Sequence, residues 1–164
     1  MRQLFLILIL ALGLQLGLQV PVAAQTSDVR IKGTSKGCFA GKRYRPGKVG
    51  IYLFDVSVAP EIPKLIHEMD GYASRSDSQS QQKFFDSYNH LLQLVRVSKS
   101  LERIQSDQFG NFTLSNLSTG LSVIVVGISP MEDDPAFYAY RELAGVKKGD
   151  NFVTLDFARG ESCK

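Results

Sequence analysis

The feature that most constrains this fold is a twofold alternation of apolar and polar side chains in short segments. Val29 and Ile31 alternate with Arg30 and Lys32, and the same pattern recurs over residues 153–157. Successive side chains of a β-strand point to opposite faces, so this period predicts strands with one buried face. Further strand candidates are residues 49–58, 96–105, 112–115, 123–128 and 137–140, separated by polar turns. We therefore expect a mainly β fold, a sandwich of seven strands.

A helical period interrupts this pattern over about residues 60–95, after the second predicted strand. The apolar stripes are Ile62, Leu65, Ile66 and Met69, and then Phe84, Phe85, Tyr88, Leu91, Leu92 and Val95. Apolar residues at such spacings form one face of a helix, so we expect a two-helix insert. Gly71 is suited to end the first helix, and Asp77 or Ser78 to cap the second. Either both stripes complete the core, or part of the aromatic stripe stays exposed as a partner site.

The N-terminus has the pattern of a secretory signal peptide. Arg2 precedes an unbroken apolar run over residues 4–14, and Val22 and Ala24 stand at −3 and −1 of a cut before Gln25. An uncleaved anchor is the alternative, but a spanning helix needs about 20 apolar residues and this run is shorter. We expect residues 1–24 to be removed, which leaves residues 25–164 as one domain that is secreted or periplasmic, with no stable membrane span.

Export to an oxidising compartment would allow the two cysteines to form a disulfide. Cys38 and Cys163 are the only cysteines and both lie in the exported part. An oxidising compartment favours a disulfide between them, which would stabilise the fold by about 4 to 5 kcal/mol in the chain-entropy model. Two free thiols are the alternative.

One segment carries more than a generic strand pattern. Residues 106–120, SDQFGNFTLSNLSTG, precede the apolar strand VIVV at 123–126. This turn–strand–turn unit resembles that of the carboxypeptidase regulatory-like domain family, whose pattern is D-x-x-G-x-F/Y-x-[apolar]-x-x-L-x-x-G. The resemblance covers most of the exported chain except residues 60–95. It departs from the family at the helical insert and at Leu121, where an aromatic is usual.

The resemblance implies a transthyretin-like β-sandwich that is a non-catalytic accessory module. The resemblance and the style of the signal peptide together favour a bacterial source. The positions that transfer are structural only: Asp107, Gly110, Phe112, Leu117 and Gly120. No catalytic residue and no cofactor is implied. A binding role for such a module predicts an envelope glycan or a protein as its partner.

The densest basic stretch supplies a candidate contact for such a partner. Lys42, Arg43, Arg45 and Lys48 lie close together in a segment that reads as a loop with a turn. They are suited to contact an acidic polysaccharide or another anionic surface; a solvated loop without a role is the alternative. The chain as a whole carries a net charge of only +3, which is too slight to indicate nucleic acid as a partner.

Sequence motifs that would indicate catalysis or metal binding are weak in this chain. The chain contains no P-loop and no G-x-G-x-x-G motif, so we expect no enzyme. The alternative is a hydrolase or metal-dependent enzyme with its site between the insert and the sandwich. His67 and Asp70 share a helix face, and His90 would be a further ligand only if the helices pack with these faces together. The acidic run at residues 132–134 is a candidate calcium loop or a solvated one.

Overall fold

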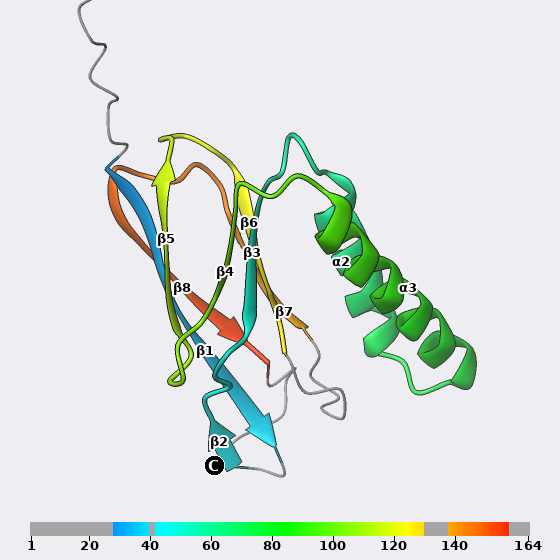
Figure 1. Ribbon diagram of the computed structural model, residues 1–164. Helices are drawn as coiled ribbons and strands as arrows, with labels where there is room; N and C mark the ends of the chain where they lie inside the picture. The colour runs from blue at the N-terminus through cyan, green and yellow to red at the C-terminus, as the bar shows by residue number, and fades with distance from the viewer. Residues whose placement is uncertain (1–27, 40–41, 130–137, 158–164) are drawn as a thin grey trace, which may run out of the picture.

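The computed structural model describes residues 28–39, 42–129 and 138–157, which form two β-sheets and two helices (Figure 1). The elements in chain order are β1 (Val29–Phe39), β2 (Lys42–Tyr44), β3 (Gly50–Asp55), α2 (Glu61–Ala73), α3 (Ser78–Val97), β4 (Glu102–Gln105), β5 (Asn111–Leu117), β6 (Val123–Ile128), β7 (Tyr138–Leu143) and β8 (Gly149–Asp156). The prediction of a mainly β fold with two inserted helices is confirmed.

The first sheet is built around β1. β5 pairs with β1 antiparallel and β8 pairs with it in parallel, while β2 pairs antiparallel with its last residues. The second sheet is antiparallel with the order β4-β3-β6-β7. In the first sheet, Val29 and Ile31 are buried while Arg30 is exposed and Lys32 half-buried, as the alternation predicts.

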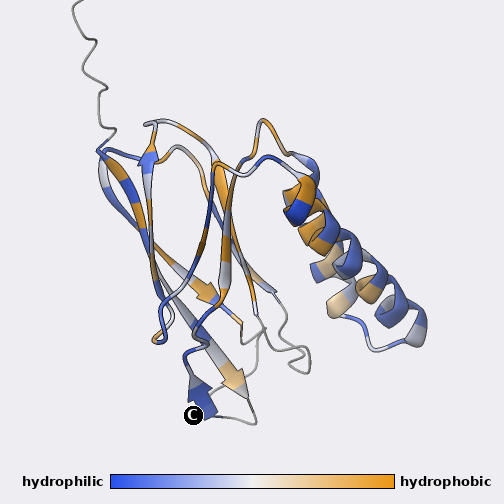
Figure 2. Ribbon diagram, in the orientation of Figure 1, coloured by the Kyte–Doolittle hydropathy of each residue, from blue (hydrophilic) through white to orange (hydrophobic). Residues whose placement is uncertain are grey.

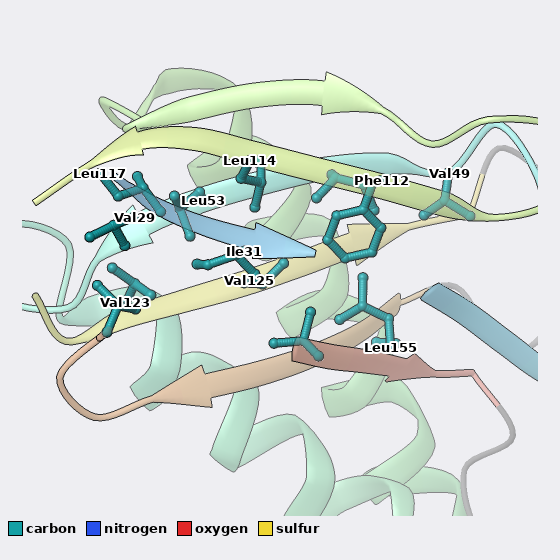
Figure 3. Close-up of a cluster of buried hydrophobic side chains, with 14 of the residues drawn as sticks. Val29, Ile31, Val49, Leu53, Phe112, Leu114, Leu117, Val123, Val125 and Leu155 are labelled. Atoms are coloured by element: carbon teal, nitrogen blue, oxygen red, sulfur yellow. The ribbon is translucent and has the colours of Figure 1, made fainter. Parts of the chain in front are cut away.

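The two sheets face each other across one hydrophobic core. It contains Ile31 of β1, Leu53 of β3 and Val125 of β6, and Leu114 and Leu155 from β5 and β8 (Figure 3). All five side chains are fully shielded from solvent. Because apolar burial is the dominant favourable term in folding, this core is what holds the two sheets together.

The opposite face of the second sheet is covered by α2 and α3, which lie on the side away from β1, β5 and β8 (Figure 1). Phe54, Ile124 and Val126 of this sheet form a second core with the helices. The helical residues buried in it are Ile62, Leu65, Ile66 and Met69 of α2, and Phe84, Leu91 and Val95 of α3. Apart from Phe85, the stripes therefore pack into the core, and the described residues form three layers: sheet, sheet and helices.

Several details of the sequence prediction are wrong. The described residues contain eight strands instead of seven, because β1 runs on to Phe39 and pairs with β2 where a basic loop was expected. The insert consequently follows the third strand, although its helices at residues 61–97 agree with the expected range of about 60–95. The first helix runs past Gly71 to Ala73, so Gly71 does not end it. Phe85 is 49% exposed. Adjacent helical residues point about 100° apart, so Phe84 and Phe85 cannot both face the sheet.

The N-cap of α3 is confirmed as Asp77. Its carboxylate accepts a hydrogen bond from the backbone N–H of Ser80 at 2.8 Å, and its backbone is extended. That bond also lowers the pKa of Asp77. A cap of this kind satisfies one of the orphan donors at the start of a helix, and it marks the chain reversal between the two helices.

Replacement of Leu91 by Ala tests the packing of the insert. Leu91 is 0% exposed in the core between α3 and the second sheet. The loss of its buried methyl groups and the cavity left behind should lower the free energy of unfolding by about 2 to 5 kcal/mol. Urea unfolding of both proteins measures this difference.

Val97→Ala is the matched control, since Val97 lies in the last turn of the same helix and is 79% exposed. It should change stability by less than about 0.5 kcal/mol. Equal, small effects of both substitutions would contradict the three-layer packing.

Candidate functional site

The predicted basic stretch forms a β-hairpin at one end of the molecule (Figure 1). β2 pairs antiparallel with the end of β1, so that Tyr44 lies opposite Gly37 and Lys42 lies opposite Phe39. A Cβ atom on Gly37 would come within 2.5 Å of the Tyr44 ring, so glycine is what lets this ring lie against the strand. Figure 2 shows β2 as strongly hydrophilic beside an apolar end of β1.

The four predicted cations of this segment, Lys42, Arg43, Arg45 and Lys48, are all exposed and are called the hairpin cations below. Within residues 28–39, 42–129 and 138–157, none of them forms an ion pair with a carboxylate. The contrast lies on β1, where Arg30 and Lys32 both pair with Asp150 at 2.8 and 2.7 Å. Among the described residues, the cations of β1 are therefore paired with carboxylates, whereas the hairpin cations are not.

The turn between β4 and β5 lies at the same end of the sandwich (Figure 1). The Asp107 carboxylate accepts hydrogen bonds from the backbone N–H groups of Asn111 at 2.7 Å and Phe109 at 2.8 Å. The bond from Asn111 is the largest cause of the lowered pKa of Asp107. Gly110 has a φ of +78°, which glycine adopts readily. The predicted Asp-x-x-Gly turn chemistry is confirmed.

Three contacts fasten this turn to the segment that follows β2. The buried Ser35 hydroxyl donates to the Pro46 carbonyl at 2.5 Å and lies 3.2 Å from the Gly110 carbonyl. The backbone N–H of Lys48 donates to the Asp107 carbonyl at 3.2 Å. Gly47 lies so close to this turn that a Cβ atom would come within 2.5 Å of a backbone oxygen. The turn and the hairpin cations Arg45 and Lys48 are thus held next to one another.

The remaining motif positions have the structural roles that were expected of them. Phe112 and Leu117 are buried in the core between the sheets. Gly120 has a φ of +82° in the turn before β6. None of these residues presents a reactive group, which agrees with their assignment as structural positions only.

Sequence reasoning missed a polar cluster where α2 meets β7. The Asp70 carboxylate accepts hydrogen bonds from the hydroxyls of Tyr138 at 2.9 Å and Tyr140 at 2.8 Å. His67, one turn earlier, lies 2.9 Å from a carboxylate oxygen of Glu142. Burial, and then the bond to Asp70, raise the pKa of Tyr140 to about 12. The signal available in the sequence was the spacing of Tyr138, Tyr140 and Glu142, which places all three on one face of a strand.

This cluster gives His67 and Asp70 protein partners. They share one face of α2, as predicted, but both oxygens of Asp70 are occupied by tyrosine hydroxyls. His90 is exposed on α3 and does not join them. In the described part of the chain, no three His, Cys, Asp or Glu residues gather to form a group that could hold a metal ion. The arrangement works as a clasp between helix and sheet.

Three expectations fall on residues that the structure does not describe. The predicted signal peptide, residues 1–24, lies outside the described range. The acidic run at residues 132–134 lies outside the described range, and so does Cys163. Of the described helices, none is long and apolar enough to cross a membrane.

The fold and the hairpin define the class of this chain: a two-sheet β protein with a helical layer and four exposed cations at the hairpin end. Comparison with known proteins adds no name to this class, because no protein-family model matches the chain and no curated protein matches it either. The resemblance to the carboxypeptidase regulatory-like family therefore stays a prediction.

Replacing Asp70 by Asn tests the clasp. The pKa of Tyr140, about 12, should fall but stay above its ordinary value of 10.0, because burial is the larger cause and Asp70 the next. Because the folded protein holds Tyr140 neutral, this residue stabilises the fold below about pH 10, and its contribution is lost as the pH rises toward 12. Ultraviolet titration of the phenols, with Tyr140→Phe as the reference that identifies the signal, measures the shift. An unchanged midpoint in Asp70→Asn would contradict the clasp.

Proposed function

We propose that this chain is an exported, non-catalytic β-sandwich module that binds an acidic envelope glycan through its basic hairpin. The single observation that carries the proposal is the charge imbalance at one end of the molecule. The hairpin cations are exposed and lack carboxylate partners within the described residues, while Arg30, Lys32 and Lys36 of β1 are paired with Asp150 or Asp156.

A polymer is the ligand that suits such a surface. A single exposed ion pair contributes only about 0 to 1 kcal/mol, so one anion would bind weakly. A polysaccharide with regularly repeated carboxylates engages several cations at once, and the effective concentration of each further group is high. Pairing of β2 with β1 places Lys42 and Arg43 next to each other on one strand, so two of the cations are presented together.

The finer fold assignment is part of the same proposal. Two sheets packed face to face, with the Asp107–Gly120 unit as turn, strand and turn, support a transthyretin-like sandwich of the carboxypeptidase regulatory-like kind. An eighth strand and a helical layer on one sheet distinguish this chain from that family's pattern. The non-catalytic role and the bacterial, exported setting follow from the resemblance and from the N-terminal pattern.

Neutralising the hairpin tests the proposed function. A variant with all four hairpin cations replaced by Gln should bind polygalacturonate, a polymer of uronic acid, at least about tenfold more weakly than the wild type. Binding of the wild type should also weaken as salt is added, because exposed charges are screened. Isothermal titration calorimetry at two ionic strengths measures both effects.

The matched control is the variant Lys147→Gln/Lys148→Gln. These lysines precede β8 beside the start of β1, whereas the hairpin lies at its end, roughly 35 Å away along the strand. The control removes two exposed charges from the opposite end and should keep nearly the full affinity. Because the control removes two charges instead of four, a response to net charge alone would give it about half the loss in binding free energy of the hairpin variant, and this outcome would contradict a site at the hairpin.

Export predicts a cut after Ala24. Val22 and Ala24 provide the small residues that signal peptidases require at −3 and −1. Intact-mass measurement of the exported protein should give the mass of residues 25–164. A mass that retains residues 1–24 would instead indicate an uncleaved anchor.

Export also predicts a disulfide between Cys38 and Cys163. Cys38 is buried near the end of β1, and the backbone N–H of Phe157 donates to the carbonyl of Lys36 at 2.8 Å. The few residues between Phe157 and Cys163 are enough to bring the two cysteines within the Cα separation of about 5.5 Å that a disulfide requires. Peptide mapping without reductant should recover the linked peptides, and alkylation of both thiols would refute the bond.

A further inference from the structure

Phe109 is a large aromatic residue that the turn around it does not require. It is 58% exposed, although it belongs to the turn that contacts the hairpin segment. The turn itself depends on the Asp107 carboxylate and on the positive φ of Gly110. The backbone at position 109 needs only an N–H group, which every residue except proline supplies, so the turn does not account for the choice of an aromatic side chain.

The backbone of Phe109 is held firmly in place. Its N–H donates to the Asp107 carboxylate at 2.8 Å, and the N–H of Gly110 donates to the Asp107 carbonyl at 3.1 Å. On either side, Gly110 and Asp107 are bonded to Ser35 and Lys48 respectively. The aromatic residue is therefore positioned by a rigid support, as an anchor in a binding site must be.

The same support fixes two cations beside the turn. The backbone N–H of Lys48 donates to the backbone carbonyl of Asp107, and Arg45 adjoins Pro46, whose carbonyl accepts from the Ser35 hydroxyl, so the backbone of both cations is held beside the turn. The one carboxylate within the turn, that of Asp107, is engaged by N–H groups. An exposed aromatic ring therefore lies at a fixed end of the molecule that also presents positive charge.

We infer that Phe109 is the sugar-stacking residue of the glycan site, with Arg45 and Lys48 contacting the acid groups. This inference rests on the proposed function and deepens it, because it assigns the ligand class as a polymer of acidic sugars. The face of a phenyl ring carries partial negative charge, and the C–H groups on one face of a pyranose carry partial positive charge. A sugar ring stacked on Phe109 brings its carboxylate toward neighbouring cations.

A comparison of two polyanions separates stacking from charge. Phe109→Ala should weaken binding of polygalacturonate about tenfold, the effect typical of removing an aromatic stacking partner. It should leave the binding of inorganic polyphosphate unchanged, because polyphosphate carries charge without sugar rings. Both affinities are measured by calorimetry at one ionic strength.

Phe152→Ala is the matched control. Phe152 is 75% exposed on β8, opposite Lys32 of β1 and away from the hairpin. The substitution Phe152→Ala removes an exposed ring of the same size and should leave both affinities unchanged. A loss of polygalacturonate binding in Phe152→Ala but not in Phe109→Ala would place the stacking residue on the sheet and overturn the inference.

The remaining outcomes are also decisive. Unchanged polygalacturonate binding in Phe109→Ala overturns the inference while the proposed function stands, provided that the hairpin variant still loses affinity. An equal loss for both polyanions would show that the ring acts only on the folding of the site. Binding of the wild type to phosphatidylglycerol vesicles that Phe109→Ala abolishes would assign the ring to a lipid surface instead. A wild-type protein that binds no polygalacturonate overturns the proposed function and the inference together.

Discussion

The rest of this structure depends on the burial of the second sheet on both of its faces. In β6, Val123 and Val125 point into the core between the sheets, and Ile124 and Val126 point into the core under the helices. A strand that is apolar on both sides cannot face water on either, so it must lie at the centre of three layers. The helical insert is therefore a structural necessity for this particular sheet, since without it Ile124 and Val126 would be exposed.

The clasp at Asp70 fits the same requirement. Apolar packing between a helix and a sheet is not directional, whereas hydrogen bonds from two tyrosine hydroxyls to one carboxylate fix a helix in register with a strand. The two hydrogen bonds to Asp70 therefore fix the position of α2 relative to β7. Both oxygens of this carboxylate are engaged by tyrosine hydroxyls, so we assign Asp70 a structural role.

At the hairpin end of the sandwich, a small number of polar contacts hold the loops in place. Ser35 is buried in β1 and joins the segment after β2 to the turn before β5 through two carbonyl groups. Ser106 makes a second such link, with its hydroxyl accepting from the N–H of Val49 at 3.0 Å. Buried hydroxyls that satisfy loop carbonyls and amides in this way give loops the rigidity of the sheets. Preorganised loops would favour the proposed binding role, because less entropy is lost when a ligand binds to loops that are already ordered.

The sequence by itself determined those features that depend on local periodicity. Four such features could be predicted from the sequence, because each follows from backbone geometry within a few residues. They are the alternation at Val29 and Ile31, the stripe from Ile62 to Met69, the cap at Asp77 and the turn at Gly110. The tertiary structure decided what depends on distant partners. β2 is a strand only because the end of β1 supplies its hydrogen bonds, and the choice between Phe84 and Phe85 depends on which side of α3 meets the sheet. Asp70 meets Tyr138 and Tyr140, and Ser35 meets Pro46 and Gly110, only after the chain has folded. Local patterns specify elements, whereas the sites arise where long-range packing brings the elements together.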